Sequence, residues 1–166
     1  MKHARRWQAM GWAALAVLIV AATAPAGAPK AEPPKEAVSV TILGIRATNE
    51  EKPYIDPALK AIEAELKAFK FNSFRLVVND TRSVAIGKSW ELAMVEGYAR
   101  RVEPQKVDGN KVTMNLSWIQ YTEGKDGKRE GQVRERLTLT IRKGKYLLSG
   151  GWELKEGRLM GAVAVK

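Results

Sequence analysis

The chain has 166 residues, of which 45% are hydrophobic and 28% are charged, so it can bury the core of one ordinary domain and is not disordered throughout. It contains no cysteine, and its one histidine is His3. This excludes disulfides, thiolate chemistry and cysteine-bound zinc, and beyond residue 3 it excludes Ser-His-Asp sites, Cys-His sites and histidine-bound metals. We therefore expect no cofactor and no enzymatic activity.

The first 28 residues have the order of a secretory signal peptide. Positive charges come first: Lys2, Arg5 and Arg6. The apolar run at 11–22 and the small residues at 24–28 follow, and the run is shorter than the roughly 20 residues that span a bilayer. We predict a signal peptide at 1–26, cut after Ala26, with a cut after Ala28 as the alternative. The protein is then exported by a bacterium, to the periplasm or beyond; an uncleaved leader anchored in the inner membrane is the other possibility.

Residues 27–37 are rich in proline and charge, which predicts a flexible spacer. Residues 37–46 are β-branched and apolar, as in a strand covered on both faces. Asp56 and Pro57 suit the start of a helix, and residues 74–78 predict the next strand. The apolar stripe of the predicted helix is Leu59, Ile62, Leu66 and Phe69. This half is predicted to form a strand–helix–strand unit.

From Ser89 onward the pattern alternates with the period of two that is typical of strands. In residues 111–121 every second side chain is apolar: Val112, Met114, Leu116 and Trp118. The triplet Asp108-Gly109-Asn110 predicts a hairpin turn before this strand. Six or more short strands predict an antiparallel β-sandwich or a partly closed barrel. We therefore expect one α+β domain at 38–166, in which the strand–helix–strand unit precedes the sandwich.

Four short motifs carry a resemblance. They are Ile55-Asp56-Pro57-Ala58-Leu59, Ser73-Phe74-x-Leu76, Leu147-Leu148-x-Gly150-Gly151 and Gly157-x-Leu159. In these motifs, over residues 38–166, the chain resembles a group of short exported bacterial proteins of unassigned function. The resemblance implies an exported bacterial domain and supplies no catalytic residues.

The positive charge is concentrated in the C-terminal half. Residues 29–96 carry 10 Lys and Arg against 10 Asp and Glu, whereas residues 97–166 carry 15 against 8. A basic face attracts acidic partners, and export together with the lack of a known motif argues against nucleic acid. We predict a non-catalytic accessory domain of the cell envelope that binds an acidic protein, lipopolysaccharide, lipid headgroup or acidic glycan. The predicted contact residues are Arg134, Arg136, Arg142, Lys143, Lys145 and Tyr121.

Three alternatives stay open. The cations could simply keep the sheet solvated and its edges unpaired. The chain could be a carbohydrate-binding module, because Tyr121 lies in phase with polar residues and is expected at the surface, whereas Trp90 and Trp118 are expected in the core. It could also be a histidine-free glycoside hydrolase, which needs two carboxylates facing one cleft. The carboxylates on predicted strands are Glu91, Glu96, Glu103 and Glu135.

Overall fold

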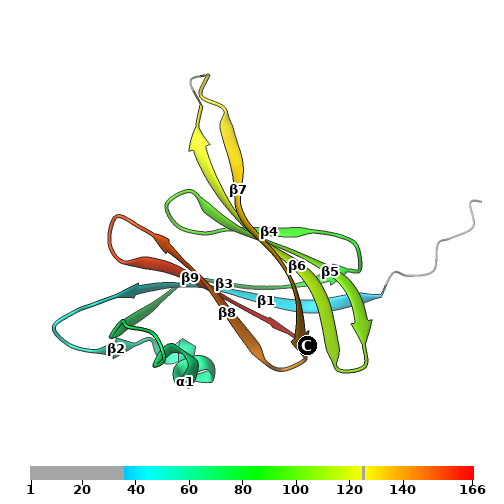
Figure 1. The fold of residues 1–166 in the computed structure, drawn as a ribbon, viewed down its shortest axis with the longest axis horizontal. Coiled ribbons are helices and arrows are strands. Elements are labelled where there is room, and N and C mark those ends of the chain that lie inside the picture. The colour runs from blue at the N-terminus through cyan, green and yellow to red at the C-terminus, as the bar shows by residue number, and fades with distance from the viewer. Residues whose placement is uncertain (1–35, 125) are drawn as a thin grey trace, which may run out of the picture. The chain divides into compact units, whose positions relative to one another are not determined.

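The protein is described here from a computed structural model, which covers residues 36–124 and 126–166 (Figure 1). The predicted signal peptide at 1–26 and nearly all of the predicted spacer at 27–37 lie outside these residues. The strands are β1 (Ala37–Thr48), β2 (Tyr54–Ile55), β3 (Ser73–Ala85), β4 (Trp90–Ala93), β5 (Tyr98–Asp108), β6 (Lys111–Glu123), β7 (Arg129–Arg142), β8 (Tyr146–Glu153) and β9 (Arg158–Val165). The described chain is thus mostly β-structure in two sheets.

The first sheet has five strands in the order β2-β3-β1-β9-β8, and β1 runs antiparallel to both of its neighbours. Both faces of β1 are covered, as its β-branched and apolar sequence predicts. Val40 and Ile42 belong to the core between the two sheets. Leu43 and Ile45 belong to a second cluster on the opposite face.

A short helical segment covers that opposite face, and it is shorter than the predicted helix. It consists of a 3₁₀ helix η1 (Pro57–Ile62) and a single α-helical turn α1 (Glu63–Leu66). The side chain of Asp56 caps η1 by accepting a hydrogen bond from the Ala58 amide at 2.9 Å, as expected. The helical turn ends at Leu66, which is fully buried against the sheet, whereas the side chain of Phe69 is 39% exposed. Short helices depend on such packing for stability.

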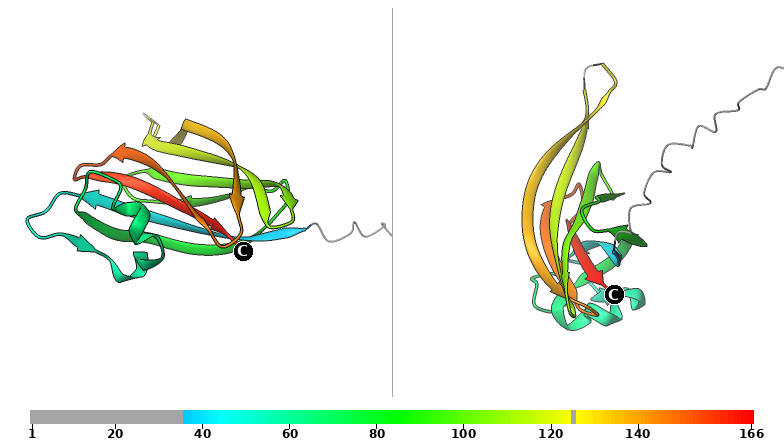
Figure 2. Two further views of the ribbon diagram at one scale, coloured as in Figure 1. Left: turned by 60° about the horizontal axis from the view of Figure 1, so that its bottom comes forward. Right: turned by 90° about the vertical axis from the view of Figure 1, so that its right-hand side faces the viewer.

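The second sheet has four antiparallel strands in the order β4-β5-β6-β7 and is curled (Figure 2). The predicted alternation in β6 is confirmed, because its four apolar side chains are fully buried. The predicted hairpin turn joins β5 to β6 with Asp108 opposite Lys111. A tight turn joins β4 to β5, and in it Glu96 and Gly97 both have positive φ.

Two rows of residues face each other where the sheets meet. Register places Arg100, Trp118 and Glu135 in one row across β5, β6 and β7. The facing row across β1, β9 and β8 is small: Gly44, Gly161 and Ser149. A β-carbon on Gly161 would lie 2.7 Å from Cζ2 of Trp118. The lack of a side chain at Gly161 in the first sheet therefore makes room for the indole of Trp118 in the second sheet.

Candidate functional site

The predicted basic residues lie in two separate places. Arg134 sits at an irregularity in the β6–β7 pairing, and its Nε donates to Oε1 of Gln120 at 2.8 Å. Arg136 lies opposite Ser117 and helps line a small surface depression. Arg142 is six residues farther along the strand, which corresponds to about 20 Å at the usual rise per residue. The structure therefore does not gather all of the predicted cations into one patch.

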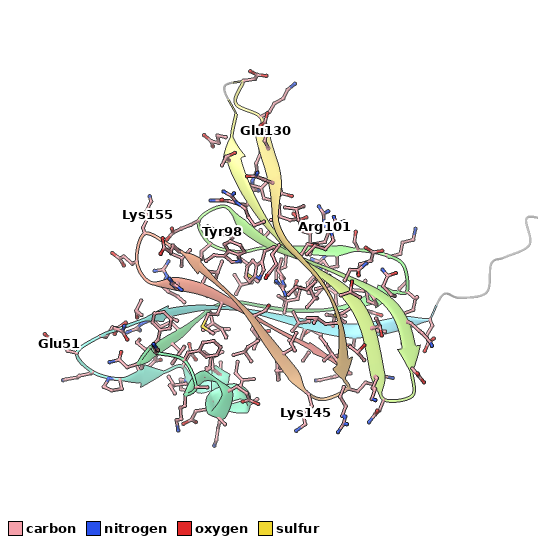
Figure 3. All side chains as sticks on the ribbon, in the orientation of Figure 1. Glu51, Tyr98, Arg101, Glu130, Lys145 and Lys155 are labelled. Atoms are coloured by element: carbon pink, nitrogen blue, oxygen red, sulfur yellow. The ribbon has the colours of Figure 1, made fainter. Side chains whose placement is uncertain are left out.

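Three of them do meet at one end of the sheets, together with a fourth cation that the sequence analysis did not select. Lys111 lies directly opposite Arg142 in the β6–β7 pairing. The amide of Lys143 donates to the Asn110 carbonyl at 2.7 Å, which draws the β7–β8 turn against the β5–β6 turn. Lys145 projects from the same β7–β8 turn (Figure 3). We call Lys111, Arg142, Lys143 and Lys145 the basic end.

The basic end is exposed, and none of its four side chains forms an ion pair within residues 36–124 and 126–166. It lies beside the start of β1, because the Gly144 amide donates to the carbonyl of Val165 and the Lys166 amide donates to that of Ser39. The predicted hairpin turn at 108–110 places Lys111 at the start of β6. This position was the available sequence signal that Lys111 lies at the same end of the sheet as Arg142.

Tyr121, predicted as an exposed ring, is half-buried and held by its neighbours. Its hydroxyl donates to Oε1 of Glu91 at 2.6 Å, and Arg101 donates to Oε2 of the same carboxylate at 2.8 Å. The Arg129 guanidinium lies 4.2 Å from the centre of the Tyr121 ring. The hydrogen bond to Glu91, then partial burial, raises the pKa of Tyr121 above that of an ordinary tyrosine. One face of this ring is therefore covered.

Arg100 is a fully buried cation whose position the sequence analysis did not single out. Its Nη2 donates to Oγ of Ser149 at 2.8 Å, and its guanidinium lies 4.7 Å from the centre of the Trp118 ring. Its Nε and Nη1 have no hydrogen-bond partner in the described part of the chain. Burial lowers the pKa of Arg100 to about 10, and the negative charge of Glu135 opposes this shift. Arg100 therefore stays charged at neutral pH.

A cavity of about 230 Å³ opens beside this row of residues. It is lined by Glu135, Gly150, Gly151, Trp152 and Arg158. Oε2 of Glu135 and Nε1 of Trp152 are buried, and neither has a hydrogen-bond partner among the described residues. The two glycines have φ values of +108° and +134°, and the β8–β9 register shifts at this point, so the strand is irregular here.

The strand carboxylates are dispersed. Glu91 pairs with Arg101 on one side of the second sheet, whereas Glu135 belongs to the row that faces the first sheet. Each of three cavities in the described chain is lined by one carboxylate, from Glu103, Glu63 or Glu135. In the part that the structure covers, these cavities do not supply the facing pair that a glycoside hydrolase needs.

Within the described ranges, the longest and most apolar helix falls short of what a membrane crossing requires. The chain matches no protein-family model, and no curated protein or solved structure shows significant similarity to it.

Proposed function

We propose that this protein is a non-catalytic, exported binding domain of the bacterial cell envelope, and that its basic end contacts an acidic partner. The scaffold that we propose is an α+β domain in which a strand–helix–strand unit precedes the sandwich. The observation that carries the proposal is the gathering of Lys111, Arg142, Lys143 and Lys145 at the tips of two neighbouring turns, without ion-pair partners in the described chain. Like charges held together repel one another, and an anionic surface relieves that repulsion.

Among acidic partners we favour the anionic headgroups of a lipid bilayer. Strand β1 begins beside the basic end, and the predicted spacer and leader precede β1 in the sequence. In a chain that its uncleaved leader anchors in the membrane, the basic end would therefore lie next to the spacer that leads to the membrane. A lysine or arginine near an anionic membrane contributes about 1 kcal/mol, so four contribute about 4 kcal/mol, which corresponds to roughly millimolar binding. We expect weak binding that salt abolishes.

Co-sedimentation with lipid vesicles tests the proposal. The processed protein is expected to sediment with vesicles that contain phosphatidylglycerol but not with vesicles of phosphatidylcholine alone, and only at low salt. The variant with Arg142→Glu, Lys143→Glu and Lys145→Glu is expected to stay in the supernatant.

The matched control reverses three exposed lysines near the far end of β1: Lys52→Glu, Lys60→Glu and Lys70→Glu. It changes the net charge by the same amount, so a response confined to the first variant assigns binding to the basic end. Equal loss of vesicle binding in both variants would show that binding depends on net charge alone and not on the basic end. No loss of vesicle binding in either variant would refute the proposal. Retention on a soluble acidic glycan but not on vesicles would replace the lipid with a glycan as the partner.

A further inference from the structure

We propose that the cavity beside Glu135 and Trp152 binds a single neutral sugar residue through its hydroxyl groups. The cavity lies between β7 and β8, one edge strand of each sheet. It does not include the basic end, so this inference goes beyond the proposed function and does not depend on it.

The charges around the cavity are balanced, which disfavours an ionic ligand. Arg100 lies behind the wall, where it is bonded to Ser149, the neighbour of Gly150 in the chain, and its charge interacts with that of Glu135. At the rim, Nη2 of Arg158 lies 3.5 Å from Oε1 of Glu153. Two cations therefore stand against two carboxylates, and neither sign of charge is in excess.

The polar atoms at the cavity call for a ligand that both donates and accepts hydrogen bonds. The Glu135 carboxylate only accepts, whereas the guanidinium of Arg158 and the indole N–H of Trp152 only donate. Of these groups, Oε2 of Glu135 and Nε1 of Trp152 are buried without a hydrogen-bond partner in the described chain, whereas Arg158 is exposed. Buried polar groups nearly always have partners in folded proteins, and the exceptions call for an explanation. A hydroxyl group meets both needs, and adjacent hydroxyls on one ring can reach a carboxylate and a donor together.

One wall of the cavity is aromatic and held in place. Trp152 is half-buried and stacks on Tyr98, with the ring centres 6.2 Å apart and the planes 25° from parallel. A rigid indole provides apolar area against which the C–H groups of a sugar ring can pack. Binding sites of this general kind combine an apolar wall with a few polar groups that orient the ligand.

Size and backbone geometry limit the ligand to about one ring. The volume of about 230 Å³ is below the roughly 300 Å³ at which sites for drug-sized molecules begin. Gly150 and Gly151 keep the β8 side free of side chains. A β-carbon on Gly150 would approach Cζ2 of Trp118 at 3.0 Å, and the positive φ of both residues disfavours any other residue type.

NMR titration of the processed protein, which lacks only the predicted signal peptide, with a panel of neutral monosaccharides tests the inference. Backbone amide signals of Gly150 and Gly151 and the indole N–H signal of Trp152 are expected to shift, while signals of the basic end stay in place. Glu135→Gln is expected to weaken binding at least about tenfold, because it removes the charged acceptor. The control Glu130→Gln alters an exposed carboxylate on the same strand and is expected to change nothing.

Glu135→Gln also leaves the buried Arg100 unbalanced, so a second variant guards against misfolding. Arg158→Gln changes an exposed side chain and is expected to weaken binding several-fold with the rest of the spectrum unchanged. Binding of an oligosaccharide at least as strong as that of its terminal monosaccharide would identify the source as a glycan. Binding of the monosaccharide but not of the oligosaccharide would identify a free sugar.

The absence of shifts at the cavity with every sugar in the panel would overturn the inference. So would shifts with zwitterionic amino acids but not with sugars. The basic-end variant is expected to bind sugar normally, so the two proposals fail independently of each other.

Discussion

Gly161→Ala tests the way the two sheets fit together. The new β-carbon would lie 2.7 Å from Cζ2 and 3.1 Å from Cη2 of Trp118, which is closer than such atoms approach in folded proteins. Trp118 is fully buried and cannot swing aside. Overpacking of this kind costs about 1–3 kcal/mol, and the smaller entropy of an unfolded chain with alanine offsets about 0.5 kcal/mol. We expect the free energy of unfolding to fall by about 0.5–2.5 kcal/mol.

Gly44→Ala is the matched control, because Gly44 lies directly opposite Gly161 in the β1–β9 pairing. There the nearest neighbours of a β-carbon are Sδ of Met94 and Cβ of Val78, both at 3.3 Å. The flexible methionine can yield, and a shift of a few tenths of an ångström relieves the contact with Cβ of Val78. We expect the free energy of unfolding to change by no more than about 0.5 kcal/mol. Urea denaturation, followed by tryptophan fluorescence and circular dichroism, measures both variants.

A third variant identifies Trp118 as the cause. Trp118→Phe removes the outer part of the indole, so adding Gly161→Ala to it should remove most of the stability loss that Gly161→Ala causes in the natural chain. Equal stability loss at Gly44 and Gly161 would refute the reasoning, as would simple additivity of the Trp118 and Gly161 changes.

Three further outcomes follow from individual contacts. Arg100→Met with Glu135→Gln should leave the free energy of unfolding unchanged or raise it by up to about 3 kcal/mol, because burial lowers the Arg100 pKa to about 10, which reflects roughly 3 kcal/mol of burial cost. A clear loss of stability in urea denaturation would contradict this. Because the pKa of Tyr121 is raised, its hydrogen bond to Glu91 should stabilise the protein at neutral pH and lose that effect as the pH rises through the raised pKa. Glu91→Gln should lower the pKa of Tyr121 in an absorbance titration, and an unchanged titration curve would contradict the role of this hydrogen bond. Asp56→Ala should cost about 1 kcal/mol in thermal unfolding and Asp56→Asn clearly less, whereas equal losses would deny the cap.

The predictions that the structure confirms are local. Alternation along one strand predicted the buried face of β6, and a β-branched, apolar run predicted that both faces of β1 are covered. The residues at 108–110 predicted their own turn. The predicted helix was too long, because its apolar stripe extends to Phe69, whereas the helical turn ends at Leu66 and the side chain of Phe69 is 39% exposed. A periodic pattern shows which face is apolar, but it does not show how much partner surface is available.

The candidate sites were harder to predict, because each combines residues from several strands. Composition located the excess charge in the C-terminal half. However, Arg136 and Arg142 lie six residues apart on β7, and Lys111 joins the basic end only because the turns bring β6 and β7 together there. Nothing in the sequence distinguishes Arg100 from the other cations of the C-terminal half. In the structure, strand register places it beside Trp118, and it donates a hydrogen bond to Ser149.

The sequence by itself therefore determined the β-rich class, the strand faces and several turns, because these depend on spacing along the chain. Only the tertiary structure decided that Trp118 fits against Gly161, that a buried Arg100 stands near Glu135, and that four cations share one end. The physical reason is that strand order and register set which side chains meet across two sheets. Both result from packing of the whole domain, and a local pattern does not specify them.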